Sequence, residues 1–297
     1  MPRLLLLLLL PAVLFAAVPA RAQDAPPDTA SAWQTSLVGK LAASQAGYQN
    51  WQEGGINTVA FTVSTSGEAT RTVGAWAQAH EGRLAFGLIG QEFDQDEFSF
   101  RKADDVIRLS SSLQYDGEGF FSTFNPTVAA TARTQFAEGF NYSEDPLGLD
   151  RPLPAKVSDV LSPGTFTQAV GLTYQPAEWF KQRVGVGVKE TVVLIERLRP
   201  LYGVDPDQSV RLEAGLEART EVDRVILENV RLQSALALFA AFNQPDQPDA
   251  LWENVVTMQV NRYLSVGLEF VTLYDQDISR RAQIKEVLTL GVSVTLL

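Results

Sequence analysis

The sequence contains no cysteine and a single histidine, His80. Without cysteine the chain can form no disulfide, hold no metal through thiolates and carry no lipid on an N-terminal Cys. A hydrolase built on Ser, His and an acid would have to use His80, and no serine occupies a Gly-x-Ser-x-Gly elbow. The setting Gln78-Ala79-His80-Glu81-Gly82 is that of a polar turn. We therefore predict that His80 is an exposed turn residue, and we expect no cofactor and no enzymatic activity.

Long apolar runs are also missing beyond the N-terminus. A short basic start, an apolar run over residues 4–18 and the site Ala20-Arg21-Ala22 predict a cleaved signal peptide over residues 1–22. We expect residues 23–32 to be a flexible leader and residues 33–297 to form one domain. No later run approaches the roughly 20 apolar residues of a spanning helix, which excludes a helical membrane protein. A membrane β-barrel stays possible, because each of its strands needs only about 10 alternating residues.

Positive charge is scarce. The net charge is −11, and without Arg3 and Arg21 of the leader 22 basic and 35 acidic residues leave −13. A protein this acidic is poorly suited to binding nucleic acid or an anionic lipid surface through bulk charge. We therefore expect no nucleic-acid partner.

The most informative feature that is present is an alternation of period two, clearest after Leu251. Over residues 251–261, 264–274 and 288–296, apolar side chains occupy one face and polar side chains the other. Residues 208–220 repeat the pattern with charges, since Leu212 and Leu216 alternate with Arg211 and Glu217. Such alternation is typical of β-strands whose two sides meet different media.

The alternation predicts about twelve strands, within a range of roughly 10 to 14, if Asn57–His80 is one long strand and not a hairpin. An even count lets the first and last strands pair antiparallel with both termini on one side, which favours the single strand. The predicted connections alternate in length. Short ones cover 80–82, 176–179, 221–224 and 261–262, and long ones cover 92–104, 141–163, 192–207, 243–250 and 275–281. Outer-membrane barrels have this layout, with short periplasmic turns and longer outside loops.

Periodicity alone fits two architectures, because the apolar faces point inward in a soluble sandwich and outward to lipid in a membrane barrel. Three features favour the barrel: the lack of regular edge protection, aromatic residues near strand ends, and the secretion signal. These aromatic residues are Tyr174, Trp179 and Phe180 at the short-turn end and Phe242, Trp252 and Tyr274 at the loop end. We predict an all-β fold, a single up-and-down antiparallel transmembrane β-barrel in the bacterial outer membrane. Its expected partners are outer-membrane lipids and the barrel insertion machinery, and its oligomeric state stays open.

Several short motifs support the same fold. They are Asn50-Trp51 with Gly54-Gly55, Thr134-Gln135-Phe136 with Gly139, Trp252-Glu253-Asn254, residues 258–263, residues 274–277 and residues 285–288. Through these residues the chain resembles an uncharacterised family of bacterial outer-membrane-type proteins, the domain of unknown function DUF3078. The resemblance runs from about Trp33 to the C-terminus and is most specific in the last fifty residues or so. It implies an outer-membrane barrel and supplies no activity.

In such a barrel the charged faces meet inside. The candidate lumen-facing residues are Arg133, Arg183, Lys189, Arg211, Glu213, Glu217, Arg219 and Arg231. We expect them to pair with one another across strands. A narrow pore is the alternative, because eight-stranded barrels are filled by side chains and barrels of sixteen or more hold a water channel. Two acidic clusters, Asp94-Gln95-Asp96-Glu97 and Asp275-Gln276-Asp277, match no EF-hand spacing, so we expect solvated loop charge and no metal site.

Three functional hypotheses follow. The first is a non-enzymatic outer-membrane barrel, which is either a structural component of the envelope or a narrow channel. The second is an outer-membrane enzyme acting on lipid or lipopolysaccharide, for which no nucleophile–base pair is visible in the sequence. The third is a soluble periplasmic β-protein that binds an apolar ligand inside, which reverses the facing of every strand.

Overall fold

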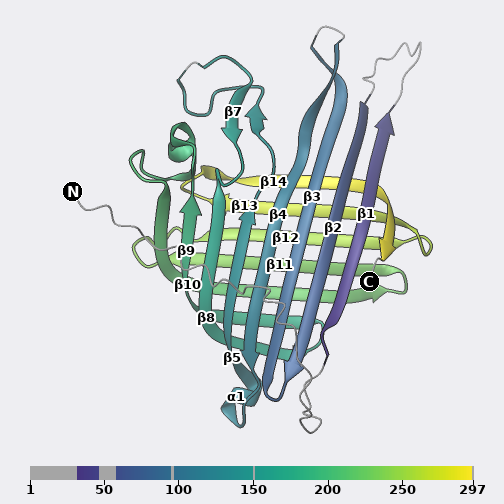
Figure 1. Ribbon diagram of the computed structural model, residues 1–297, viewed down its shortest axis with the longest axis vertical. Helices are drawn as coiled ribbons and strands as arrows, with labels where there is room; N and C mark the ends of the chain where they lie inside the picture. Colours follow the sequence, from purple (N-terminus) through teal and green to yellow (C-terminus); the bar gives the residue numbers. More distant parts are fainter. Residues whose placement is uncertain (1–31, 47–57, 95–96, 150, 296–297) are drawn as a thin grey trace, which may run out of the picture.

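The protein is a closed β-barrel. The computed structural model describes residues 32–46, 58–94, 97–149 and 151–295. Within them twelve antiparallel strands close in the order β1-β14-β13-β12-β11-β10-β9-β8-β5-β4-β3-β2, and β6 and β7 form a separate two-stranded sheet (Figure 1). The predicted fold class and the count of about twelve strands are confirmed. The predicted signal peptide lies outside the described residues.

The barrel strands follow one another in an up-and-down meander. Their bounds are β1 (Gln34–Ala46), β2 (Thr58–Val73), β3 (Trp76–Asp94), β4 (Glu97–Tyr115), β5 (Phe124–Thr134), β8 (Gly164–Ala177), β9 (Phe180–Val192), β10 (Val210–Leu227), β11 (Val230–Ala241), β12 (Asp249–Gln259), β13 (Leu264–Asp275) and β14 (Ser279–Thr295). β1 and β14 pair antiparallel and close the barrel. The start of β1 and the end of β14 therefore lie at the same end of it.

The facing of the strands is that of a membrane barrel. Leu212, Leu216 and Val292 are 58%, 54% and 48% exposed on the outer wall. Glu217, which directly follows Leu216 on β10, is buried and bonded to Arg183 inside. The apolar faces thus point out and the charged faces point in, as predicted. The third hypothesis requires the reverse facing, and the structure contradicts it.

The prediction that Asn57–His80 is one strand is wrong. β2 and β3 form a hairpin that pairs without a slip from Val73↔Trp76 to Thr58↔Gln91. Gly74 has a φ of 57°, which glycine adopts without steric cost, so the chain reverses in two residues. The outward positions change from odd numbers on β2 (Phe61, Val63) to even numbers on β3 (Trp76, Leu84), so the alternation shifts phase at this turn. Residues 80–82, predicted as a turn, lie within β3, and the count stays at twelve because residues 83–91 belong to the same strand.

Three other predicted connections are strand for most of their length. Residues 221–224 belong to β10, whose turn is Glu228-Asn229. Residues 92–104 belong mainly to the β3–β4 hairpin, and residues 275–281 leave only 276–278 between β13 and β14. Figure 1 shows β3 and β4 rising beyond the level of β11–β14. Where a hairpin leaves the barrel wall, both faces meet water, so polar residues there do not signal a loop.

The two ends of the barrel differ in the size of their connections. At the short-turn end, the strands are joined by 74–75, 116–123, 178–179, 228–229 and 260–263. At the loop end, residues 135–163, 193–209 and 242–248 form long connections, as predicted. The short-turn end carries α1 (Phe120–Thr123), and the loop end carries β6 (Gly139–Asn141), β7 (Ala155–Ser158) and the 3-10 helix η1 (Glu196–Tyr202). Among the described residues, no helix is both long enough and apolar enough to cross a membrane.

The two longest connections pack into a loop cap, defined as residues 135–149, 151–163 and 193–209. Its small core is Val193, Leu198 and Val204, which are almost fully buried. The Tyr202 hydroxyl donates to the Val157 carbonyl at 2.8 Å, which joins η1 to β7. Burial raises the pKa of Tyr202 to about 12. The cap is therefore a folded unit with an apolar core of its own.

Candidate functional site in the barrel lumen

The charged faces of the strands build an ion-pair network inside the barrel. Arg108 on β4 and Glu253 on β12 form a hydrogen-bonded ion pair, and of the pairs in this network theirs joins the strands that lie farthest apart around the barrel. Five strands separate β4 from β12 in either direction around the barrel, so the two side chains come from opposite walls. They meet across the lumen and bridge it.

Other pairs cross the lumen close to this bridge. Arg83 on β3 donates to Glu269 on β13 at 2.8 Å. Lys285 on β14 donates to the same carboxylate at 3.1 Å and to Asp104 on β4 at 2.8 Å. Three strands lie between the partners of the Arg83–Glu269 and Lys285–Asp104 pairs on the shorter way round. The network therefore fastens one side of the barrel to the other at several points.

The eight predicted candidates lie mostly in a second part of the network, along β9 and β10. Arg183 binds Glu217 in a two-pronged contact at 2.8 and 3.2 Å. Lys189 lies 2.9 Å from Glu213 and also binds Asp249, while Arg211 lies 3.2 Å from Glu213 and also binds Asp277. Their pairing reaches neighbouring strands and beyond. A role of these residues in binding a solute stays a prediction.

The remaining three candidates are placed differently. Arg219 contacts Glu221 two residues along β10, at 2.5 Å. Arg133, at the end of β5, lies 3.8 Å from Glu253. Arg231 is on the inward side of β11 but at the short-turn mouth, where its pair with Asp223 is more than 40% exposed on both sides. The structure thus places Arg133 beside the cross-lumen bridge and Arg231 at the mouth.

The residues that cross the lumen were not among the candidates. Glu253 and Glu269 occupy the polar faces of strands that the alternation predicts correctly, so a search of those faces for charges finds them. Asp104 falls in a segment that was predicted as a loop. No sequence signal identifies their partners on the opposite wall. Those partners lie on strands that are not hydrogen-bonded neighbours, so the register of strand pairing does not place them opposite each other.

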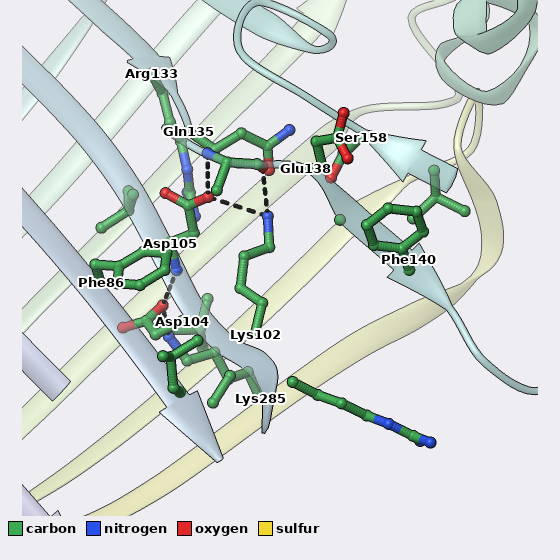
Figure 2. Close-up of a pocket in the computed structure, with 18 of the residues that line it drawn as sticks. Phe86, Lys102, Asp104, Asp105, Arg133, Gln135, Glu138, Phe140, Ser158 and Lys285 are labelled. Atoms are coloured by element: carbon green, nitrogen blue, oxygen red, sulfur yellow. Dashed lines mark hydrogen bonds and ion pairs between the residues drawn. The ribbon is translucent and has the colours of Figure 1, made fainter. Parts of the chain in front are cut away.

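A chamber of about 610 Å³ lies between this network and the loop cap. Figure 2 shows Asp104, Asp105 and Lys102 of β4 on one side of it and Glu138, Phe140 and Ser158 of the cap on another. Asp105 accepts hydrogen bonds from the backbone N–H groups of Phe136 and Ala137 at 2.8 and 2.9 Å. Lys102 donates to Asp105 at 3.0 Å and to the Ala137 carbonyl at 2.8 Å. These bonds hold the cap against β4.

A much smaller space of about 40 Å³ lies toward the short-turn end. Its lining includes Glu81, Lys181, Arg183, Arg219 and Glu221. The structure thus has a roomy chamber under the loop cap and a small space toward the short-turn end.

Aromatic side chains surround the short-turn end of the outer wall. Trp76, Phe120, Phe121, Phe124, Tyr174 and Trp179 are exposed there. Phe120 stacks on Phe124, which stacks on Tyr174, with ring centroids 5.0 and 5.4 Å apart. Of the aromatic residues predicted at the loop end, Phe242 and Trp252 are exposed. Such rings suit the interfacial regions of a membrane, where an apolar body meets a polar edge.

His80 does not lie in an exposed turn, and that prediction is wrong. It lies within β3, where Nδ1 is 2.9 Å from Ser111 Oγ and the ring is 5.4 Å from the Trp33 ring. This Ser–His contact is the closest approach to a hydrolytic site, and sequence spacing alone could not show it. No carboxylate contacts His80 among the residues that the structure describes, so the third member of a triad is missing there.

The two acidic clusters do not form a metal site in the described part of the chain. No group of three or more His, Cys, Asp or Glu residues that could hold an ion occurs in residues 32–46, 58–94, 97–149 and 151–295. Asp277 binds Arg211. Residues 95 and 96 of the first cluster lie outside the described residues.

The chain matches one family model and is similar to several solved structures. The family model described as "Protein of unknown function (DUF3078)" matches residues 43–140. This stretch includes the motifs at 50–55 and 134–139, but not the last fifty residues, where the resemblance was expected to be most specific. No curated protein matches the chain.

Several solved structures are similar to the chain. The translocator domain of autotransporter NalP from Neisseria meningitidis is 6% identical over 87% of this chain and 86% of that one, with a TM-score of 0.36. The COG4313 outer membrane channel from Pseudomonas putida F1 is 9% identical over 92% and 99%, also with a TM-score of 0.36. OmpF from Salmonella typhi, in complex with daunomycin, is 8% identical over 88% and 97%, with a TM-score of 0.29. The resemblance to the DUF3078 family is thus confirmed over residues 43–140, and the chain has the fold of outer-membrane β-barrels.

Proposed function

We propose that this protein is a structural barrel of the bacterial outer membrane whose lumen is closed to ion flow. The observation that carries the proposal is the Arg108–Glu253 bridge between opposite walls. Charged side chains that neutralise each other across the lumen occupy the space that a conducting path needs. The Arg83–Glu269 and Lys285–Asp104 pairs also cross the lumen and support the same conclusion.

The outer wall supports the location. Leu41, Val63, Leu109, Val170 and Leu288 are more than half exposed, on five different strands. An apolar surface of this extent is stable in contact with hydrocarbon and costly in water. Outer-membrane lipids are the partners that such a wall requires, and the barrel insertion machinery is the expected route into the membrane. Recovery of the mature chain in the soluble periplasmic fraction without detergent would refute the location.

Conductance in planar lipid bilayers tests the closure. We expect no conductance steps from the wild-type protein. A double variant, Arg108→Ala with Glu253→Ala, removes the bridge and its charges together, and we expect it to conduct. The matched control is Arg231→Ala with Asp223→Ala, which removes an ion pair from the short-turn mouth and leaves the bridge in place. We expect this control to be silent.

A narrow channel is the second candidate function, because the chamber and the smaller space below it lie in one lumen. Regular conductance steps from the wild-type protein would establish the channel and overturn the closed barrel.

A further inference from the structure

Arg133 is a guanidinium with unused donors in the wall of the chamber. Arginine carries five N–H donors and no acceptor. Among the described residues the side chain of Arg133 makes no hydrogen bond, and its ion-pair partner, Glu253, lies 3.8 Å away. Glu253 is already hydrogen-bonded to Arg108. The Glu253 carboxylate thus interacts with two guanidinium groups, and its interaction with Arg133 is the weaker one.

Charged side chains of both signs line the chamber. The cationic ones are Arg83, Arg101, Lys102, Arg108, Arg133 and Lys285. The anionic ones are Asp104, Asp105, Glu138, Glu253 and Glu269. Glu138 also pairs with Lys156, which is not part of the lining. The lining is therefore rich in cations, although the chain as a whole is acidic.

The exposed fractions compare the charged side chains on the barrel wall of the chamber. The side chain of Arg133 is 38% exposed and that of Lys285 is 36% exposed, whereas the carboxylates of Glu253 and Glu269 are at most 20% exposed. Glu138, on the loop cap, is more exposed and pairs with Lys156. On the wall, Arg133 is therefore open to a molecule in the chamber, and an anion beside it gains charge-assisted hydrogen bonds from donors that no group among the described residues uses.

Apart from Gln135 and Ser158, the rest of the lining is mostly apolar and aromatic. Phe86, Phe100, Phe140 and Tyr142 contribute rings, and Leu88, Val106, Val157 and Val271 contribute aliphatic surface. A volume of about 610 Å³ falls within the range of roughly 300–1,000 Å³ that is typical of small-molecule sites. An apolar pocket with a few convergent polar groups favours a ligand that has an apolar body and one charged group.

We propose that the chamber binds a small organic anion, in which a single carboxylate pairs with Arg133 and an aromatic body packs against the apolar lining. The proposal goes beyond the closed barrel and does not depend on it, since the ligand can bind whether or not the lumen conducts.

Calorimetric titration of the purified barrel in detergent micelles with 2-naphthoate tests this. Its neutral isostere, 2-naphthamide, measures the binding that is due to the ring and to the micelle alone. We expect naphthoate to bind more tightly than naphthamide, and Arg133→Gln to weaken naphthoate by about 10- to 100-fold, the range for hydrogen bonds to charged groups. Naphthamide binding should not change in that variant.

Three further variants make the test specific. Arg231→Gln removes the same side chain at the short-turn mouth, outside the chamber, and should leave the affinity unchanged. Arg133→Lys keeps the charge and should restore part of the affinity. Glu253→Gln keeps the shape but releases both guanidinium groups, so it should tighten naphthoate binding. Heat-modifiable migration of each variant on an SDS gel checks that it is folded.

The proposal is overturned if naphthoate and naphthamide bind equally, if neither binds, or if folded Arg133→Gln protein binds naphthoate as the wild type does. These results are distinct from a failure of the proposed function, which appears as conductance steps from the wild-type barrel.

Discussion

Removal of the Glu253 carboxylate is the most direct test of the cross-lumen network. Glu253→Ala leaves Arg108 without its hydrogen-bonded partner and Arg133 without its only ion-pair partner among the described residues. Breaking a buried pair by removing one partner costs about 3–5 kcal/mol, because the remaining charge is left uncompensated. Arg108 is 23% exposed and Arg133 is 38% exposed, so water in the chamber relieves part of this cost. We therefore expect the low end, about 3 kcal/mol.

Urea unfolding of the barrel in lipid vesicles, followed by the emission of its five tryptophans, measures the loss. Arg108→Ala and the double variant complete a double-mutant cycle, in which we expect the double variant to lose less than the sum of the single losses. Arg231→Ala is the control. Its pair with Asp223 is exposed, and such pairs contribute about 1 kcal/mol or less. If Glu253→Ala costs no more than Arg231→Ala, the bridge does not stabilise the barrel and the reasoning fails.

Three other predictions concern the wall and the loop cap. In Gly171→Ala the new Cβ would lie 2.3 Å from the Val184 carbonyl oxygen of the paired strand, so urea unfolding should show that the free energy of unfolding falls by about 1–3 kcal/mol. In the control Gly82→Ala, the new Cβ would meet only Leu109 Cδ2, at 3.5 Å, and the loss should be smaller. Because the pKa of Tyr202 is raised from 10.0 to about 12, its contribution to stability is complete below pH 10 and is lost as the pH rises toward 12. Phenolate absorbance should show one late-ionising tyrosine that Tyr202→Phe removes, and its persistence in that variant would contradict the assignment. A membrane-impermeant thiol reagent should label Leu149→Cys, in the loop cap, but not Leu212→Cys until detergent is added; rapid labelling of Leu212→Cys in vesicles would place β10 the wrong way round.

The facing of the strands could be predicted from sequence because each strand reports it independently. On β10, Leu212 and Leu216 alternate with charged residues such as Arg211 and Glu217. The two leucines are exposed on the outer wall, whereas Arg211 and Glu217 form ion pairs inside the barrel. The signature cannot say which medium lies on which side. The predicted secretion signal and the strand-end aromatic residues favoured apolar faces that point outward, and the exposed leucines of β10 confirm this facing.

Strand boundaries were harder to predict, for a physical reason. Between Val73 and Trp76 the chain reverses through Gly74, and the outward positions change from odd to even numbers; a turn this short resembles an irregularity within one strand. In β3 and β4 the opposite happens, because the polar residues near Asp94 and Glu97 resemble a loop although they belong to strands. The alternation of apolar and polar residues reflects the medium on each side of a strand, so it changes where the strand leaves the membrane. It does not show where hydrogen bonding to the neighbouring strand ends.

The partners in the lumen could not be predicted at all. Arg133 appeared among the candidates, but its position beside Glu253, which lies on the far wall, depends on the width and tilt of the closed barrel. The Ser111–His80 contact is equally invisible, since the two residues meet only through the register of β3 and β4.

The number of strands explains why this lumen is bridged by long charged side chains. Eight-stranded barrels are narrow enough to be filled from every wall, and barrels of sixteen or more strands are too wide to be filled. At twelve strands, Arg108 and Glu253 still reach each other from opposite walls, each contributing an extended side chain. Paired Arg, Lys and Glu side chains can therefore bridge a barrel of this width, and Arg133 lies beside such a bridge because it shares the carboxylate of Glu253 with Arg108.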